Sequence, residues 1–140
     1  RFEIPIRRRR DLRDLGLRTA LCTGRGRPST AVILEHLKMA SWFEVTVTGE
    51  EVPRPKPFPD GILDTARRLG MPPEAILYTG DSVKDVEAGL AAGAFTVAAL
   101  WAGTEEEGEG IQRADGLARQ PGDLLTLLAG RQAFRNPIAE

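Results

Sequence analysis

Two acidic residues stand four positions apart where an apolar segment gives way to a helical pattern. They are Asp81 and Asp85, within the stretch ILYTGDSVKDVEAGLAAGA. Gly80 is expected to let the backbone turn there, and one helical turn separates the two carboxylates, so both can face the same point. Oxygen ligands suit a hard cation such as Mg²⁺, which takes one or two carboxylates together with waters and phosphate oxygens. The alternative is an N-cap and a first-turn acid favoured by the helix dipole.

A threonine and a lysine earlier in the chain could act on the same chemistry. Thr23 ends the apolar, β-branched segment LRTALCT, and Lys56 lies in the proline-rich segment VPRPKPFPD. Prolines on both sides of Lys56 make its loop rigid, and lysine occurs only at positions 38, 56 and 84 of this chain, which singles this residue out. Alternatively, Thr23 is only a β-forming residue at the end of a strand, and Lys56 is an ordinary loop lysine.

The elements that must position these residues follow from hydrophobic periodicity and turn residues. The expected strands are Leu17–Thr23, Glu44–Thr48, Ile76–Thr79 and Phe95–Leu100. The expected helices are residues 6–15, a helix opened by Pro28 and Ser29 with apolar residues Val32, Ile33, Leu37 and Met39, and then Asp60–Leu69, Val83–Ala92 and Gly122–Ala129. The segment WAGTEEEGEG, residues 101–110, is expected to be a loop.

Strands that alternate with helices predict an α/β fold with a parallel sheet covered by helices on both faces. In such sheets, ligands bind at the carboxyl ends of the strands. Because Thr23 and Asp81 follow strand ends and Lys56 lies on the loop after the second strand, we expect these three residues to meet at one edge of the molecule.

Composition limits the classes of partner. The chain has 140 residues, a mass of 15.2 kDa and 41% hydrophobic residues, which suits one domain. A net charge of -1 does not favour nucleic acid or an anionic membrane, so a small molecule is the expected partner. A single Cys22 excludes an internal disulfide, and the chain has no secretory signal and no apolar run of the roughly 18 residues that span a bilayer. We expect an intracellular, cytoplasmic protein.

Three segments together resemble the motifs of haloacid dehalogenase-like phosphohydrolases. GDSVKDVEAGLAAGA resembles the fourth motif of this family, ALCTGR the second and PRPKPFPDGI the third, and they occur in the family's order. The resemblance extends over residues 12–128 and is nearest to phosphoglycolate phosphatase-like members. It implies a Rossmann-like core and Mg²⁺-dependent hydrolysis of a small phosphorylated metabolite, through an aspartyl-phosphate intermediate.

The resemblance also implies roles for individual residues. Asp81 would be a direct Mg²⁺ ligand, and Asp85 a more distant partner of the metal that acts through water. Thr23 would hydrogen-bond a phosphate oxygen, with Gly24 beside it in the substrate-binding loop, and Lys56 would neutralise charge between the phosphate and the nucleophile. Many phosphoglycolate phosphatase-like members have Asn directly after this Thr, so the substrate is left open.

The family's first motif, an Asp-x-Asp that supplies the nucleophile, does not occur in this sequence. In the family its strand lies in the middle of the sheet, between the strands of the second and fourth motifs. The resemblance therefore predicts four strands around an unfilled central position, and a chain that is neither stable nor active alone. We expect the strand to come from an upstream segment or from a complementing chain; a homo-oligomer is the other arrangement left open.

The expected organisation has three parts. Residues 1–16 form a helix that returns from an unseen upstream cap region, residues 17–130 form the C-terminal portion of the core, and residues 131–140 form a tail. Two other functions remain open: a non-catalytic binding or regulatory module that has lost its nucleophile, and a phosphomutase or phosphonate hydrolase on the same fold.

Overall fold

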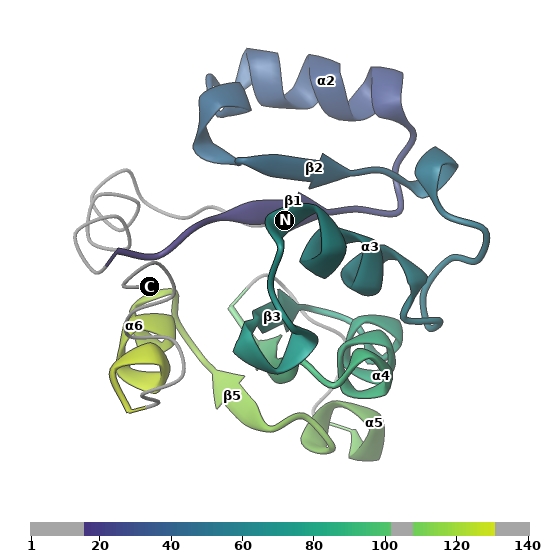
Figure 1. Cartoon of the computed structure of the whole chain (residues 1–140). Helices are drawn as coiled ribbons and strands as arrows, with labels where there is room; N and C mark the ends of the chain where they lie inside the picture. Colours follow the sequence, from purple (N-terminus) through teal and green to yellow (C-terminus); the bar gives the residue numbers. More distant parts are fainter. Residues whose placement is uncertain (1–15, 102–107, 131–140) are drawn as a thin grey trace.

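The computed structural model describes residues 16–101 and 108–130, which form an α/β fold as predicted. Strands and helices alternate along the chain (Figure 1). The strands are β1 (Ala20–Cys22), β2 (Val45–Val47), β3 (Leu77–Gly80), β4 (Phe95–Ala99) and β5 (Gly116–Ala118). The helices are α2 (Arg27–His36), α3 (Asp60–Leu69), α4 (Val83–Ala92), α5 (Glu109–Gln112) and α6 (Gly122–Ala129), with single 3-10 turns at Ala40–Trp42, Gly49–Glu51 and Pro73–Ala75.

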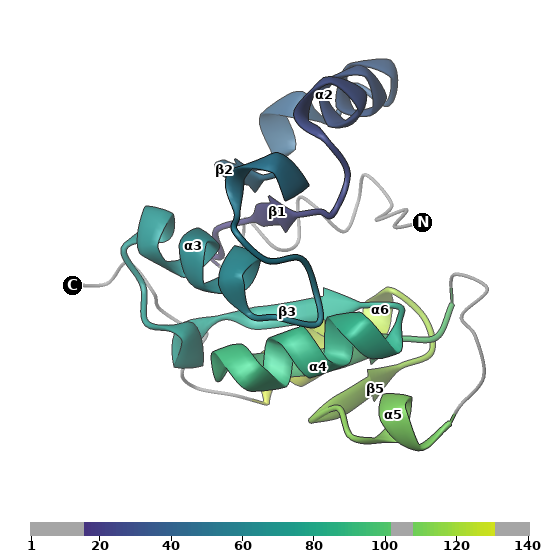
Figure 2. The same cartoon turned by 90° about the vertical axis from the view of Figure 1, so that its right-hand side faces the viewer.

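The strands form two parallel sheets instead of one. Strand β1 pairs with β2, with Leu21 opposite Thr46, and β4 pairs with β3 on one edge and β5 on the other. In both views β1 lies between β2 and β3 (Figures 1 and 2). Among the residues described, neither β1 nor β3 has a second partner strand. The interruption between them coincides with the central position that the resemblance assigns to the first-motif strand.

Helices cover both faces of the three-stranded sheet, as predicted. Helix α4 packs on one face, against β3 and β4, with α3 beside it, and α6 packs on the other face against β5 (Figures 1 and 2). Helix α3 contacts β1 and β2 as well as α4, so it connects the two sheets. One core cluster lies at this junction: Ile62 of α3 packs with Ala88 and Ala92 of α4, and Cys22 of β1 and Tyr78 of β3 pack against them.

The helices next to the predicted site begin and end where the sequence predicts. Helix α3 buries Ile62, Ala66 and Leu69, which recur at helical spacing, and ends at Gly70 with φ of 67°. Helix α4 ends at Gly93 with φ of 83°. Glycine reaches this left-handed conformation without a steric penalty, which stops each helix at a defined residue.

Three expectations about the elements need correction. The described residues contain five strands where four are expected, because the sequence does not predict β5. A short helix α5 begins at Glu109, inside the segment predicted as a loop. The strand predicted at Leu17–Thr23 extends only over Ala20–Cys22. The helix with periodic apolar residues exists as α2, but Val32 is 65% exposed and Leu37 53% exposed, so these residues contribute little to the core of the described chain.

The helix predicted for residues 6–15, the tail at 131–140 and most of the acidic segment at 102–107 lie outside the described residues. None of the described helices combines the length and apolar character needed to cross a bilayer.

Candidate active site

The loop after β1 is held by the end of the neighbouring strand β2. The Thr23 N–H donates to the Val47 carbonyl at 2.9 Å, and the Thr23 hydroxyl accepts from the Arg25 N–H at 3.2 Å. The Gly49 N–H donates to the Arg25 carbonyl at 2.9 Å, and a Cβ at Gly49 would lie 2.4 Å from the Gly24 carbonyl oxygen. Glycine at position 49 therefore lets the turn after β2 approach the Thr23 loop closely and fix its backbone.

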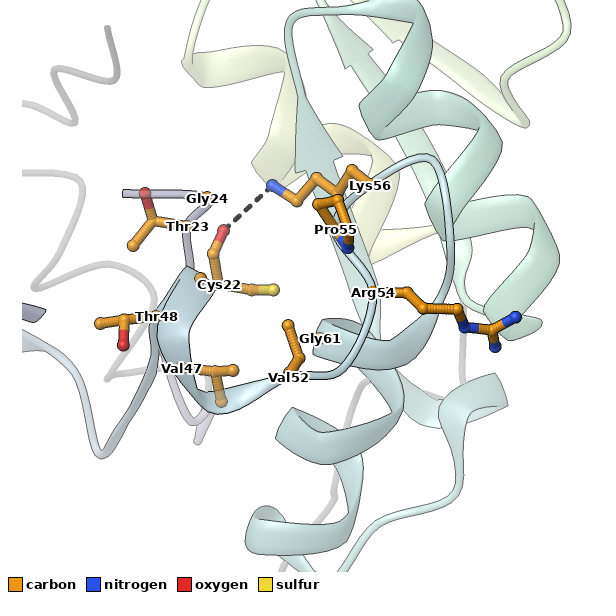
Figure 3. A pocket seen from close by; sticks show the side chains of 11 residues that line it. Cys22, Thr23, Gly24, Val47, Thr48, Val52, Arg54, Pro55, Lys56 and Gly61 are labelled. Atoms are coloured by element: carbon orange, nitrogen blue, oxygen red, sulfur yellow. Dashed lines mark hydrogen bonds between the residues drawn. The ribbon is translucent and has the colours of Figure 1, made fainter. Parts of the chain in front are cut away.

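The side chain of Lys56 reaches from the proline-rich loop to the ends of both sheets. Its ammonium lies 3.2 Å from the Cys22 carbonyl at the end of β1 and 2.9 Å from Oδ1 of Asp85 on α4. Figure 3 shows it reaching the Cys22 carbonyl at the rim of a pocket. Lysine has three N–H donors, of which these contacts occupy two. The pocket is lined by Cys22, Thr23, Gly24, Val47, Thr48, Gly49, Val52, Arg54, Pro55, Lys56 and Gly61.

Asp85 is the most heavily bonded carboxylate of the site. Its Oδ2 accepts hydrogen bonds from the Asp81 N–H at 3.1 Å, the Ser82 N–H at 3.2 Å and the Ser82 hydroxyl at 3.0 Å, and its N–H donates back to the Ser82 hydroxyl. Its Oδ1 accepts from the Tyr78 hydroxyl at 3.0 Å. This reciprocal capping box opens α4 and turns the Asp85 carboxylate towards Lys56.

Glycine is required at position 80 for a different reason from the one predicted. It belongs to β3 and does not take a positive φ, so the turn does not require glycine. A Cβ at position 80 would instead lie 2.1 Å from the Asp85 Cβ. Because Gly80 has no side chain, the Asp85 side chain can lie directly against the end of β3.

The charges of the site reinforce one another. Burial alone would raise the pKa of Asp85, but the Lys56 charge and the hydrogen bonds from Lys56, Tyr78 and Ser82 outweigh it and lower that pKa. Burial first, and then the Asp85 charge, raise the pKa of Tyr78, so its hydroxyl stays a hydrogen-bond donor. Burial also raises the pKa of Cys22, which keeps the thiol protonated and suits a packing role.

The predicted site residues form a connected set in the structure. Thr23, Gly24 and Lys56 line one pocket, Lys56 contacts Asp85, and Asp85 accepts from the backbone of Asp81. Sequence reasoning missed two of the residues that hold this set, Ser82 and Tyr78. The Ser-x-x-Asp spacing of a capping box could have revealed Ser82. A tyrosine in an apolar strand carries no comparable signal.

The described residues supply carboxylate oxygens that could bind one side of a hard cation. No group of three His, Cys, Asp or Glu side chains that could enclose a metal is found within residues 16–101 and 108–130. Asp85 accepts hydrogen bonds on both carboxylate oxygens, and Asp81 is half-buried and stands at the carboxyl end of β3. A single carboxylate with waters and phosphate oxygens is a normal environment for Mg²⁺, so the residues present fit this ion.

Comparison with known proteins agrees with this geometry. The phosphoglycolate phosphatase of Salmonella paratyphi A is 36% identical over 113 residues, which are 81% of this chain and 45% of that protein. The structure of a HAD phosphatase from Thermococcus onnurineus matches with a TM-score of 0.79 and 26% identity, over 94% of this chain and 59% of that chain.

A second structure, the β-phosphoglucomutase of Clostridium difficile, has a TM-score of 0.70 and 19% identity over 83% of this chain and 48% of that chain, and it shows the fold alone. The chain spans a little under half the length of the curated relatives it matches. A family model described as haloacid dehalogenase-like hydrolase matches residues 10–99. The motifs, the fold and this match agree, and the chain belongs to the haloacid dehalogenase-like hydrolase family.

Proposed function

We propose that this chain is the core of a Mg²⁺-dependent phosphatase that hydrolyses the monoester of a small phosphorylated metabolite. The observation that carries the proposal is the position of Lys56, whose ammonium contacts both the Cys22 carbonyl beside the Thr23 loop and Asp85 beside Asp81. Two of its three N–H donors hold it between the sheets. The third remains for a phosphate oxygen.

The residues of this chain have separate tasks in the proposed reaction. The Thr23 hydroxyl and the backbone at Gly24 bind and orient the phosphoryl group, and Lys56 neutralises its negative charge. Asp81 would hold Mg²⁺, and Asp85 would keep Lys56 and the start of α4 in place. The bound ion would supply positive charge close to the equatorial phosphate oxygens.

The nucleophile of the proposed reaction is an aspartate outside this chain, on a strand between β1 and β3. Its carboxylate oxygen attacks phosphorus while the alcohol leaves, and water then cleaves the aspartyl-phosphate to give inorganic phosphate and the free carboxylate. We propose that an upstream segment or a complementing chain supplies this strand. The unpaired edges of β1 and β3 within the described residues support this proposal.

The first experiment measures phosphate release from p-nitrophenyl phosphate by the protein that carries this chain with its nucleophile strand. Asp81→Asn should lower kcat by about 100-fold or more, because loss of a metal ligand removes several kcal/mol of charge stabilisation. Asp64→Asn is the matched control, since Asp64 pairs with Arg67 and Arg68 on α3 and does not line the pocket, and it should retain activity within about twofold. Full activity of the Asp81→Asn variant would contradict the proposal.

The metal requirement is tested separately with a chelator. EDTA should abolish phosphate release and added Mg²⁺ should restore it, whereas Ca²⁺ should restore much less because it prefers longer bonds and more ligands. Activity that resists exhaustive chelation would exclude the metal. 2-Phosphoglycolate is the first natural ester to assay, because the relatives that match this chain are phosphoglycolate phosphatases.

Two other functions are distinguished by the phosphate-release assay and by the sequence of the gene. A phosphomutase would transfer the phosphoryl group to a second hydroxyl of a sugar phosphate and release little inorganic phosphate. A non-catalytic module would lack an Asp-x-Asp in the preceding part of its gene.

A further inference from the structure

Tyr78 and Gly80 of β3 lie next to the ion pair formed by Lys56 and Asp85. Side chains alternate along a strand, so these two residues of β3 share one face. A Cβ at Gly89 of α4 would lie 2.3 Å from Oγ1 of Thr96 and 3.0 Å from Cδ2 of Tyr78, and a Cβ at Gly80 would overlap Asp85. Gly89 therefore leaves room for Thr96 and for the edge of the Tyr78 ring against α4, and Gly80 leaves room for the carboxylate above the strand.

Tyr78 contacts both charged members of the pair. Its hydroxyl donates to Asp85 Oδ1 at 3.0 Å, and the Lys56 ammonium lies 2.9 Å from that same oxygen. The Lys56 nitrogen is also 5.3 Å from the centroid of the Tyr78 ring, within the distance of about 6 Å at which a ring attracts a cation. One side chain thus fixes the carboxylate through its hydroxyl and the ammonium through its ring.

The packing of Tyr78 makes these contacts rigid. The ring belongs to the partly buried residues around the core cluster of Ile62, Ala88, Ala92 and Ala94. A ring that is confined by α3 and α4 cannot follow the carboxylate or the ammonium if either moves. Asp85 and Lys56 must therefore adjust to Tyr78, which is the property expected of a residue that sets geometry for others.

We propose that Tyr78 is a positioning residue for phosphoryl transfer: it holds Asp85 and Lys56 so that the ammonium faces the phosphoryl site at the carboxyl ends of β1 and β3. This inference rests on the proposed function. Because phosphoryl transfer depends on placing charge at the phosphate oxygens, a small displacement of Lys56 should lower the rate without preventing substrate binding.

The kinetic test compares Tyr78→Phe, which removes only the hydroxyl, with Tyr78→Leu, which also removes the ring. In the protein that carries this chain with its nucleophile strand, Tyr78→Phe should lower kcat for p-nitrophenyl phosphate about tenfold, with KM changed less than about twofold. Tyr78→Leu should lower kcat further. Thr79→Val is the matched control, since it removes a hydroxyl from the next residue, on the opposite face of β3, and should leave kcat within about twofold.

A second experiment measures the hydrogen bond between Tyr78 and Asp85 by urea unfolding of Tyr78→Phe, Asp85→Ala and the double variant. Tyr78→Phe should lower the folding equilibrium constant about tenfold with Asp85 present and less than about twofold with Ala at position 85. Additive effects would show that the hydroxyl does not hold Asp85 and would overturn the inference. A kcat for Tyr78→Phe equal to that of the wild type would also overturn it.

Failure of the inference is distinct from failure of the proposed function. An active wild type with an unaffected Tyr78→Phe variant refutes the positioning role alone. A wild type without Mg²⁺-dependent phosphate release refutes the proposed function and the catalytic role of Tyr78 with it, and the unfolding cycle then still decides whether Tyr78 holds Asp85. A kcat loss equal in Tyr78→Phe and Thr79→Val would indicate general loosening of β3 and would count against positioning.

Discussion

Space and charge at the end of β3 depend on single residues. Asp85 occupies the volume that a side chain at Gly80 would fill, and its carboxylate collects hydrogen bonds from Tyr78, Ser82 and the Asp81 backbone. Lys56 completes the arrangement from the other side. A buried charged group that lacks a partner lowers the stability of the fold. Removal of any one of these contacts should therefore destabilise the remaining contacts.

Gly80→Ala tests the steric part of this account. A Cβ 2.1 Å from the Asp85 Cβ forces the strand or α4 to move, and we expect a loss of about 1–3 kcal/mol in the free energy of unfolding. Gly24→Ala is the control, because a Cβ there would meet nothing within 4 Å, and its cost should stay below about 0.5 kcal/mol. Urea unfolding measures both, and equal values for the two variants would contradict the account.

The lowered pKa of Asp85 predicts a pH dependence of stability. The folded-state pKa lies below the unfolded value of about 3.9, so the contribution of Asp85 is complete above that value and is lost as the pH falls through the folded pKa. The urea midpoint of the wild type should therefore fall more steeply between about pH 5 and pH 2 than that of Asp85→Asn. Parallel curves for the two proteins would show that Asp85 is not stabilised by its partners.

At the scale of elements, α3 and α2 make opposite contributions. Helix α3 buries Ile62, 2% exposed, against both sheets and α4, whereas Leu37, the C-cap residue of α2, is 53% exposed. Both helices carry periodic apolar residues, so periodicity alone does not distinguish a helix that packs on the sheets from one that leaves its apolar residues exposed among the described residues.

Substitution on each helix measures this difference. Ile62→Ala should cost about 2–5 kcal/mol of unfolding free energy, since it opens a cavity in the core at the junction of the sheets. Leu37→Gln should cost less than about 0.5 kcal/mol. Thermal and urea unfolding provide the values. A cost at Leu37 that approaches the cost at Ile62 would mean that α2 packs on part of the protein beyond the described residues.

The sequence predicted the bounds of helices α3, α4 and α6 better than the bounds of the strands. Helices α3 and α4 were predicted to the residue, because apolar periodicity and a C-terminal glycine agree at both. Strand β5 was missed because its three residues, Gly116–Ala118, lack β-branched side chains and pair with β4 through their backbone. The role of Tyr78 was missed because it depends on the empty space at Gly80 and Gly89, which only the packing of α4 on β3 defines.

At the scale of the whole molecule, the interruption between β1 and β3 is the dominant feature. Each of these strands uses one edge for pairing within the described residues, and the contacts that connect the two sheets include those of α3 and Lys56. An unpaired parallel edge in the middle of a fold exposes backbone groups and apolar surface. We therefore expect the 140-residue chain to gain stability from a strand that pairs with both edges.

Comparison of two proteins tests this expectation. The 140-residue chain alone should unfold at lower temperature than the protein that also carries the Asp-x-Asp strand, should bind the dye ANS, and should release no phosphate from p-nitrophenyl phosphate. Circular dichroism melting curves and the phosphatase assay measure these properties. Equal melting temperatures, or phosphatase activity of the 140-residue chain at the level of the longer protein, would contradict it.

The most direct measurement of the central claim is a crystal structure of the longer protein with Mg²⁺ and vanadate, an analogue of the transferring phosphoryl group. We expect the cation on the Asp81 carboxylate, and the vanadate within hydrogen-bond distance of the Thr23 hydroxyl and the Lys56 ammonium. Vanadate bound away from Thr23 and Lys56, or a cation that does not contact Asp81, would contradict it.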